Sequence, residues 1–472
     1  MSQKKRYEAY ADELGALIAS GVLRAGDKLP SVRQACAARH CSPATVFQAY
    51  DLLEARGLVR AQARSGYYVL APARAAAPLA EPLPSRPPAG SQPVAVNELV
   101  FDILGRGRQA VPLGSAFPSP QLFPLDELRR AMGAAMRRLD PWAMQDDLPP
   151  GHARLRRQIA LRYLAQGHAV DAEQIVLTHG AVEALQLSLQ AVTRPGDAVV
   201  IESPTFYLAL QALERLGLRA IELPTDAREG LDLSALAEVL ERGEARACWL
   251  MTSFQNPLGA SMPEAKKREL VALLARHQVP LIEDDVYAEL YQGERAPLPA
   301  KAFDREGLVM HCGSFSKCLA PGYRVGWVAG GRFAPRLQRL KLMSSLSGSI
   351  PAQEAVAEYL QDGGYERHLR GLRQALRKQQ AAMVAAITRF FPPGTRLTRP
   401  EGGYFLWLEL PPAVQALDLY ARALDQGISV APGPMFSARG GHAQGLRLNS
   451  GHPWSAALEQ ALETLGGLAG AG

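Results

Sequence analysis

The stretch Ser314-Phe315-Ser316-Lys317-Cys318-Leu319-Ala320-Pro321-Gly322-Tyr323-Arg324-Val325-Gly326 places a lysine, two serines and an arginine around a Pro-Gly turn. The amine of Lys317 can form an imine with an aldehyde. Ser314, Ser316 and Arg324 offer hydroxyl and guanidinium donors to one phosphate dianion. The stretch is therefore suited to tether an aldehyde cofactor and to hold its phosphate, although a surface lysine beside a turn is the alternative.

Before this stretch, β-prone runs alternate with helical patterns. The β-prone runs are residues 175–178, 198–201, 247–251 and 280–284, and the helical patterns begin near residue 180 and cover 208–216 and 264–277. Apolar strands separated by helices are typical of an open parallel sheet with helices on both faces. Ligands of such sheets bind at the carboxyl ends of the strands.

Two groups of residues after these strands fit a phosphorylated aromatic cofactor. Gly180, Ala181 and Val182 begin a helix, whose free N–H groups and dipole favour a phosphate. An ordinary strand-to-helix turn is the alternative. Phe206 can stack on a flat heterocycle, although a buried core position explains a phenylalanine equally well.

Four polar residues complete this set. Asn256 lies in an Asn-Pro turn and can hydrogen-bond a phenolate oxygen. Asp284 can pair with a pyridinium N–H, and Tyr287 can reach the ring oxygen. A helix cap or a solvated strand end is the alternative for the acidic pair Asp284-Asp285. Arg447, in an apolar strand, can hold a substrate carboxylate, with an internal salt bridge as the alternative.

These segments in this order predict a pyridoxal 5'-phosphate site. Asn256-Pro-Leu-Gly, Asp284-Asp-Val-Tyr, Ser314-Phe-Ser-Lys and Arg447-Leu-Asn resemble motifs of the fold-type I aminotransferases over about residues 110–470. The resemblance implies Lys317 as Schiff-base lysine, and Asn256 and Arg447 as substrate-binding residues. It also implies a smaller C-terminal α+β subdomain from about residue 350, and a homodimer.

One region departs from that family. Its members often carry a tyrosine that reaches the partner's phosphate, shortly before a Gly-x-x-x-Leu-Arg segment. Residues 144–156 here contain Asp146 and Asp147 and no tyrosine. An acidic pair repels phosphate, so we expect no such cross-subunit contact.

Length and composition bound the remaining function classes. The 472 residues contain no apolar run near the ~20 residues of a membrane span, so no membrane association is expected. The five cysteines are scattered and lack the paired spacing of a zinc site, so no metal is expected. Reduced thiols and the absence of a signal-peptide pattern predict a cytoplasmic protein.

The positive charge is concentrated at the N-terminus. Residues 1–70 contain ten Lys or Arg and six Asp or Glu, whereas the other 402 contain 42 and 40. Residues 1–70 also predict three helices followed by a hairpin, the order of a winged helix-turn-helix. Such a domain with an excess of positive charge favours binding to double-stranded DNA.

Residues 5–70 resemble the GntR regulators through Gly26-Asp-Lys-Leu-Pro-Ser-Val-Arg33, Ser42-Pro-Ala-Thr-Val46, Leu53-Glu-Ala-Arg-Gly-Leu-Val59 and Ser65-Gly-Tyr-Tyr-Val69. The candidate DNA-binding residues are Ser31, Arg33, Ser42, Thr45, Gln48, Arg64 and Gly66. Pro43 stands where many members have an arginine, which removes one contact. A small protein-interaction module is the alternative.

A proline-rich strap, residues 71–93, holds seven prolines and predicts a semi-extended linker. We divide the chain into a DNA-binding domain (1–70), a linker (71–100) and an aminotransferase-like domain (101–472). This organisation resembles the MocR regulators. The resemblance implies transcription control gated by pyridoxal phosphate or by its adduct with an amino compound, which Arg447 suggests carries a carboxylate. A working aminotransferase with a vestigial or autoregulatory head is the competing hypothesis.

Overall fold

The structure is a computed structural model of the chain, and it describes residues 5–55, 57–62, 65–70, 78–94, 100, 110–140, 142, 148–361 and 363–471. The chain separates into two compact units. The first comprises Met1–Leu79, Arg377–Pro393 and Pro453–Ala471, and the second comprises Ala80–Leu376 and Gly394–His452.

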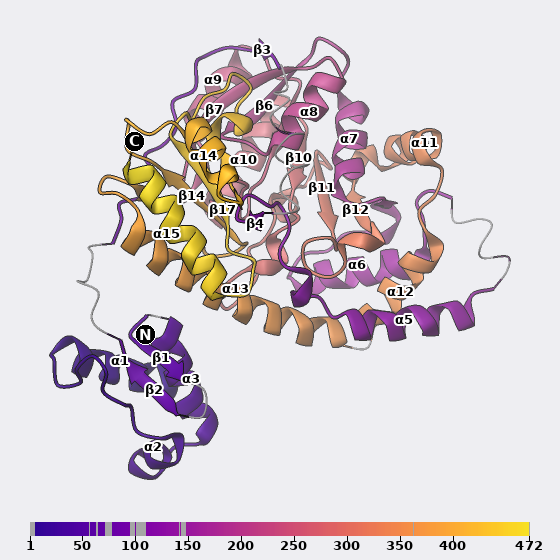
Figure 1. The fold of residues 1–472 in the computed structure, drawn as a ribbon. Helices are drawn as coiled ribbons and strands as arrows, with labels where there is room; N and C mark the ends of the chain where they lie inside the picture. The colour runs from indigo at the N-terminus through magenta and orange to yellow at the C-terminus, as the bar shows by residue number, and fades with distance from the viewer. Residues whose placement is uncertain are drawn as a thin grey trace. The chain divides into compact units, whose positions relative to one another are not determined.

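The N-terminal part of the first unit is a small helical domain with a hairpin. Its elements are α1 (Arg6–Ala19), α2 (Val32–Arg39), α3 (Pro43–Ala55), β1 (Val59–Gln62) and β2 (Gly66–Val69) (Figure 1). The two strands pair antiparallel, from Val59 opposite Val69 to Gln62 opposite Gly66. The order confirms the predicted winged helix-turn-helix.

Local sequence explains where these helices begin. Ser31 and Gln34 form a capping box at the start of α2, and the hydroxyl of Ser42 accepts a hydrogen bond from the Thr45 N–H at 3.3 Å. One face of each long helix then supplies the core. That core contains Leu14, Ile18, Val46, Tyr50 and Leu53, closed by Val59 and Val69 of the hairpin.

Two further helical segments belong to the first unit. The end of α13 (Gly364–Phe390) packs against α15 (Ala456–Gly470). The contact is close because Gly466 has no side chain, and a Cβ there would come within 2.4 Å of the Phe390 carbonyl oxygen. An alanine at residue 466 would therefore force the two helices apart.

The second unit is built on a nine-stranded sheet (Figure 1). The strand order is β3 (Gln92–Pro93), β7 (Arg219–Asp226), β6 (Ala198–Ser203), β9 (Ala247–Leu250), β10 (Leu281–Asp284), β11 (Val309–Ser314), β12 (Gly326–Ala329) and β5 (Ile175–Thr178), with β8 (Gly230–Leu231) beside β7. The central strands from β7 to β11 are parallel, as predicted. The sheet as a whole is mixed, because β3 and β12 run antiparallel to their neighbours.

Alternate residues of the central strands enter two separate cores. Val199 and Ile201 pack with α7 (Ala181–Val192), α8 (Tyr207–Arg215) and α11 (Ala334–Ser345). Val200 packs on the other face with α9 (Leu233–Glu241) and α10 (Glu264–His277). Because both faces are buried, the strands read as continuous apolar runs, which explains why they are visible in the sequence.

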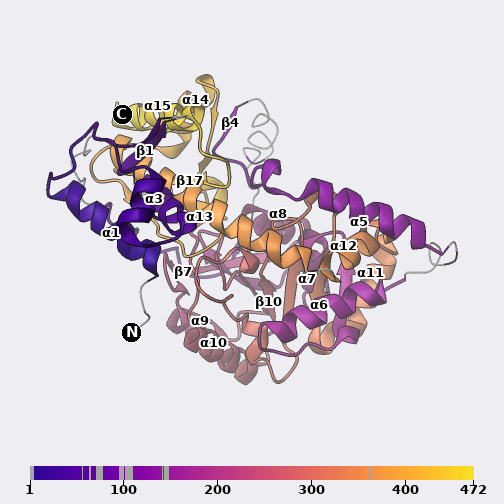
Figure 2. The same cartoon turned by 90° about the horizontal axis from the view of Figure 1, so that it is seen from below.

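A layer of helices covers the β5 side of the sheet. Figure 2 shows α5 (Leu125–Arg138), α6 (Ala153–Ala165) and α12 (Ile350–Gln361) side by side, and α12 contacts both of the others.

Within the described residues, no helix is long and apolar enough to cross a membrane.

A second, four-stranded sheet forms the smaller subdomain expected after about residue 350. Its order is β13 (Arg396–Leu397), β14 (Phe405–Glu409), β17 (Gly445–Asn449) and β16 (Ala431–Pro432), all antiparallel. α14 (Ala416–Asp425) precedes β15 (Ile428–Ser429), which pairs with β4 (Val111–Pro112). This pairing brings the chain after residue 110 to the edge of the smaller subdomain.

Much of the proline-rich strap is held against the second unit. The Leu397 N–H donates to the Ala80 carbonyl at 2.9 Å, and the Thr225 N–H donates to the Ser85 hydroxyl at 2.9 Å. Gln92 and Pro93 then form the edge strand β3 beside β7. From Ala80 to Pro93 the strap is therefore held by hydrogen bonds and strand pairing rather than freely extended.

Candidate functional site

Lys317 lies just beyond the carboxyl end of β11. Its ammonium group donates to the Ala116 carbonyl at 2.8 Å and lies 3.7 Å from the centre of the Phe117 ring. By surface area the side chain is only half-buried. The protein packed around its amine nevertheless lowers the pKa of Lys317 to about 7, and the nearby Arg447 adds to this effect. A substantial fraction of this amine is therefore neutral and nucleophilic near neutral pH.

The predicted phosphate ligands converge beside Lys317. The hydroxyls of Ser314 and Ser316 lie 2.9 Å apart, and Arg324 donates to the His179 carbonyl at 2.9 Å. Arg324 has a positive φ of 53°, and its guanidinium lies beside Gly180 at the start of α7. These groups form one cradle at the N-terminus of that helix.

Gly180 is needed at this cradle for two reasons. Its φ is 83°, and an added Cβ would approach the Arg324 guanidinium to 2.7 Å. Ala181 and Val182 follow as the first residues of α7, so their N–H groups belong to the unpaired first turn. The sequence interpretation as an ordinary turn does not account for this convergence with Arg324.

Asp284 ends β10 and is almost completely buried, with 1% of its surface exposed. One of its carboxylate oxygens, Oδ1, has no hydrogen-bond partner among the described residues. Burial, aided by the charge of Asp285, raises the pKa of Asp284 to about 7. The next residue serves a different network, because Asp285 bonds His311 Nε2 at 3.0 Å.

Asn256 and Tyr287 lie in the same buried region. The Asn256 Oδ1 atom accepts a hydrogen bond from Arg447 at 2.9 Å, whereas its Nδ2 atom has no partner among the described residues. The Tyr287 ring packs edge-on against Tyr404 and Phe405, with centroids 5.5 Å away in each case. Phe206 caps α8 and packs against the hydrophobic cluster that contains Tyr287.

Arg447 occupies the middle of β17 and is 1% exposed. It donates to Asn256 and to the Gly114 carbonyl at 2.7 Å, and its guanidinium lies 4.4 Å from the Phe405 ring centre and 5.1 Å from that of Phe436. In the described part of the chain, none of the ion pairs involves Arg447. The alternative of an internal salt bridge is therefore not observed.

Three buried polar atoms at this site lack partners among the described residues. They are an acceptor on Asp284, a donor on Asn256 and a donor at Nε of Arg447. Unpaired buried polar groups are rare, because each costs about 1–3 kcal/mol. An acceptor for a ring N–H, a donor for a ring oxygen and a donor for a carboxylate fit pyridoxal phosphate carrying an amino acid.

Sequence reasoning missed the segment that closes this site. Residues 113–119 are held by Asn449, which donates to the Ser115 and Phe117 carbonyls at 2.9 and 2.7 Å, and by Tyr404, which donates to Ala116 at 3.1 Å. A Cβ on Gly114 would lie 2.6 Å from the Val430 backbone. The Gly-Ser-x-Phe-Pro pattern beginning at residue 114 was the available signal for such a close approach.

The candidate DNA-binding residues are distributed around α2 and α3. Arg33, Ser42 and Gln48 are exposed and Thr45 is half-buried, whereas Ser31 and Ser42 also cap the helices. Gly66 begins β2 with a φ of 115°. Arg64 lies outside the described residues, as do Asp146 and Asp147. The predictions for these three residues, and the DNA contacts of the other candidates, stay predictions.

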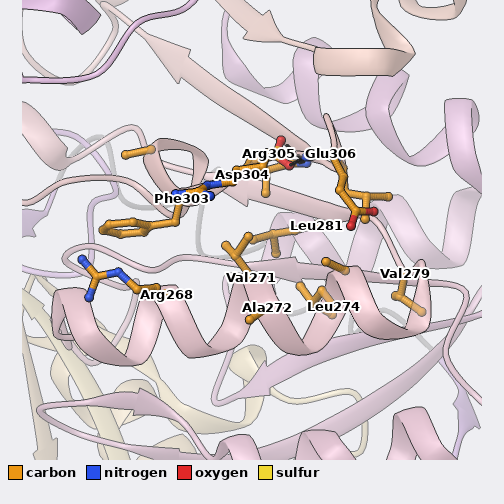
Figure 3. Close-up of a pocket in the computed structure, with 14 residues that line it drawn as sticks. Arg268, Val271, Ala272, Leu274, Val279, Leu281, Phe303, Asp304, Arg305 and Glu306 are labelled. Atoms are coloured by element: carbon orange, nitrogen blue, oxygen red, sulfur yellow. Dashed lines mark hydrogen bonds between the residues drawn. The ribbon is translucent and has the colours of Figure 1, made fainter.

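A separate pocket of about 360 Å³ lies between α10 and the chain before β11 (Figure 3). Figure 3 shows Val271 and Leu274 of α10 facing Leu281, while Arg268 extends toward Phe303. Leu281 begins β10 and Asp284 ends it. The pocket is therefore at the opposite strand ends from the site around Lys317.

Comparisons with known proteins agree with both units. Residues 127–465 match the family "Aminotransferase class I and II", and residues 6–69 match "Bacterial regulatory proteins, gntR family". The HTH-type transcriptional regulator YdcR of Escherichia coli (strain K12) is 47% identical over 98% of this chain and 99% of its own length.

Solved structures resemble the larger part of the chain. A kynurenine aminotransferase of Pyrococcus horikoshii has a TM-score of 0.75 and 28% identity, covering 80% of this chain and 95% of that one. The α-aminoadipate aminotransferase LysN of Thermus thermophilus has a TM-score of 0.72 and 32% identity, covering 79% and 94%. With a GntR-family domain before a class I and II aminotransferase domain, and with similarity to an HTH-type regulator over nearly its whole length, the chain belongs to the MocR-type regulators.

Proposed function

We propose that this protein is a DNA-binding transcription regulator whose aminotransferase-like domain binds pyridoxal phosphate and senses that cofactor or its adduct with an amino compound. The single observation that carries the sensing function is the set of three unpaired buried atoms on Asp284, Asn256 and Arg447. These two donors and one acceptor are buried, and no described residue bonds them. They therefore match a ligand that carries the complementary groups. The helix-turn-helix domain would bind the operator DNA.

Different residues of the site would bind different parts of the cofactor. Ser314, Ser316, Arg324 and the start of α7 would bind the phosphate, and Phe206 would stack on the ring. Asp284 would hold a proton on the ring nitrogen, while Asn256 and Tyr287 would contact the ring oxygen. Bound there, pyridoxal phosphate supplies an aldehyde that joins amines reversibly and a ring that withdraws electrons.

Lys317 is suited to compete with a ligand amine for that aldehyde. Burial and the positive charge of Arg447 lower its pKa to about 7, so the neutral amine is available near neutral pH. A ligand amine in place of the lysine would leave the Lys317 amine free to take up a proton near Asp284. Occupancy by a ligand therefore changes the charge distribution at the centre of the site.

The ligand should be an amino compound with a carboxylate. Arg447 is a buried cation whose hydrogen bonds within the described residues go to an amide and a carbonyl oxygen. A carboxylate would neutralise that charge and use the free Nε donor. LysN, a structure similar to this chain, was solved with N-(5'-phosphopyridoxyl)-L-leucine, which has both features.

The protein is expected to act as a homodimer. Several large apolar side chains of the second unit are exposed, including Met136 (50%), Trp142 (74%), Leu342 (41%), Met343 (84%) and Leu346 (55%). Leu342, Met343 and Leu346 lie close together in sequence at the end of α11, and exposed apolar residues grouped in this way are typical of an interface. Two DNA-binding domains on one dimer would recognise two half-sites, and ligand binding would shift the population of dimers that fit them.

Binding to operator DNA tests this proposal directly. The full chain would be titrated onto DNA from its own promoter region at several salt concentrations, without cofactor, with pyridoxal phosphate, and with added amino acids. We expect specific, salt-sensitive binding whose affinity changes with the cofactor or the adduct. Binding that is equally strong for unrelated DNA, or that ignores both compounds, would contradict the proposal.

A second candidate function is transamination. It is supported by Lys317, Asp284 and Arg447, which are the residue types that such chemistry uses. Assays of amino-acid and keto-acid turnover on the same preparation would decide between them. Rapid turnover without specific DNA binding would identify an aminotransferase with a vestigial head.

A further inference from the structure

Two of the contacts that hold the strap against the second unit differ in character. Near Ala80 the contact is exposed, and Glu81 pairs with the guanidinium of Arg228 at the surface. Near Gln92 the contact is buried, with only 2% of that side chain exposed. The exposed pair is screened by solvent, so the buried contact is the stronger candidate for a specific function.

The buried contact centres on the carboxylate of Glu222, on β7. Gln92 donates to one of its oxygens at 2.8 Å, and the Ala438 N–H donates to the other at 3.2 Å. The Ser203 hydroxyl lies 3.5 Å from that second oxygen. Glu222 is 3% exposed and takes part in none of the ion pairs between described residues. Burial raises the pKa of this carboxyl group.

Two of these three partners of Glu222 lead directly to the ligand site. Ala438 follows the short turn η8 (Gly433–Phe436), and the Phe436 ring lies against Arg447. Ser203 ends β6, two residues before Thr205, whose N–H donates to the Phe436 carbonyl at 2.9 Å. The third partner, Gln92, belongs to the strap that continues to the DNA-binding domain.

Ligand binding should disturb this arrangement at Arg447. Its two terminal nitrogens each donate one hydrogen bond, to Asn256 and to the Gly114 carbonyl, and its Nε atom has no acceptor among the described residues. A bidentate carboxylate needs two donors. A carboxylate bound to Nε and the neighbouring terminal nitrogen would draw the guanidinium toward the ligand. We therefore expect Arg447 to turn, and Phe436, whose ring centre lies 5.1 Å from the guanidinium, to move with it.

We propose that Glu222 couples the ligand site to the strap, so that a carboxylate on Arg447 loosens the contact between Glu222 and Gln92. This inference rests on the proposed function, because it requires the site to bind an amino-acid adduct. Movement of Phe436 displaces the Ala438 N–H from the shared carboxylate. Glu222 then reorganises its remaining hydrogen bonds, and β3 separates more readily from β7.

The test uses the full chain and hydrogen exchange of the strap amides between residues 86 and 94. The probes are N-(5'-phosphopyridoxyl)-L-leucine and the matching adduct of 3-methylbutylamine, which lacks only the carboxylate. We expect the leucine adduct to accelerate exchange about tenfold, the scale of one hydrogen bond to a charged group. The amine adduct should bind and leave the strap unchanged.

Two variants separate coupling from simple anchoring. In Gln92→Ala the strap should exchange faster without ligand and should no longer respond to the leucine adduct, while still binding it. Arg228→Ala removes the exposed contact and should keep the full response. Glu222→Gln, which keeps the shape and removes the charge, should reduce the response.

The outcomes distinguish the inference from the function on which it rests. If the wild type binds the leucine adduct and its strap does not respond, or if Gln92→Ala responds as the wild type does, the coupling is overturned. If the wild type binds neither adduct, the proposed sensing function fails together with the coupling.

Discussion

The two binding regions of this chain differ in how their polar groups are used. At the site around Lys317, polar groups are buried and three of their atoms are unpaired among the described residues. In the DNA-binding domain the candidate contact residues are mostly exposed, and Ser31 and Ser42 already cap helices. The buried site therefore reveals its ligand's chemistry, whereas the exposed surface does not reveal which DNA sequence it reads.

This contrast has an energetic origin. An unpaired polar group in water is solvated, so an exposed arginine or glutamine does not indicate which group it binds. An unpaired group in the protein interior destabilises the fold until a ligand satisfies it. Substitutions at the buried site should thus have large and chemically specific effects, and substitutions in the head smaller ones.

The largest effect is expected for Lys317→Ala. Because no other lysine is predicted to reach the aldehyde, covalent attachment of pyridoxal phosphate should be abolished, together with the visible absorption of the linked cofactor. Mass spectrometry after borohydride reduction measures the attachment. Lys266→Ala, on α10, serves as the control and should retain it. Cofactor still fixed covalently in Lys317→Ala would show that the assignment is wrong.

Replacing Arg447 should give the next largest effect. Arg447→Gln removes the cation while keeping an amide in its place, so the affinity for N-(5'-phosphopyridoxyl)-L-leucine should fall about a hundredfold. Affinity for the adduct of 3-methylbutylamine should change little. Isothermal titration with both compounds measures the difference. An equal loss for both would mean that Arg447 supports the fold rather than the carboxylate.

Asp284 predicts an effect of pH on the cofactor-free protein. Burial raises its pKa to about 7 in the folded state, compared with 3.8 for an ordinary aspartate. The folded protein therefore keeps a proton that the unfolded chain releases, and stability falls as the pH rises from about 4 to about 7. Asp284→Asn should flatten this dependence and stabilise the cofactor-free protein at pH 8, by roughly a few kcal/mol.

Thermal melts at pH 5 and pH 8 test this prediction. The same variant should bind pyridoxal phosphate more weakly, because the amide does not match the charge of a protonated ring nitrogen. Greater stability combined with weaker binding is the signature of a residue kept for its ligand. An Asp284→Asn protein that is less stable at pH 8 would contradict the burial argument.

The sequence predicted those parts of the fold and the site that depend on contacts between residues close together in the chain. Lys317, Asp284 and Gly180 follow strands buried on both faces, and the carboxyl ends of such strands meet at one edge. Their convergence therefore follows from local patterns. Arg447 was found as a charged residue in an apolar strand, which is unusual enough to mark a partner.

Other features depend on contacts that leave little local trace. Ala116 and Phe117 close the site, and they are held there by hydrogen bonds from Tyr404 and Asn449. These two residues are 288 and 332 positions further along the chain than their acceptors. The prolines of the strap exclude a helix, and the sequence therefore predicted a linker. The edge strand β3 was not predicted, because two residues are too few to show an alternating apolar pattern. The antiparallel β12 was not among the predicted strands, because a four-residue Gly-Trp-Val-Ala run is too short to indicate a strand or its direction.

The smallest effects are expected in the DNA-binding domain, where two exposed residues can be compared. Gln48, on α3, would contact a base edge, so Gln48→Ala should weaken operator binding about tenfold and leave binding to unrelated DNA nearly unchanged. Arg33, on α2, would contact phosphate. Arg33→Ala should weaken both kinds of binding and reduce the salt dependence by about one counterion. Fluorescence anisotropy at several salt concentrations separates the two patterns. If Gln48→Ala lowers both affinities equally, α3 does not read bases through this residue, and the specificity of the head must come from other side chains.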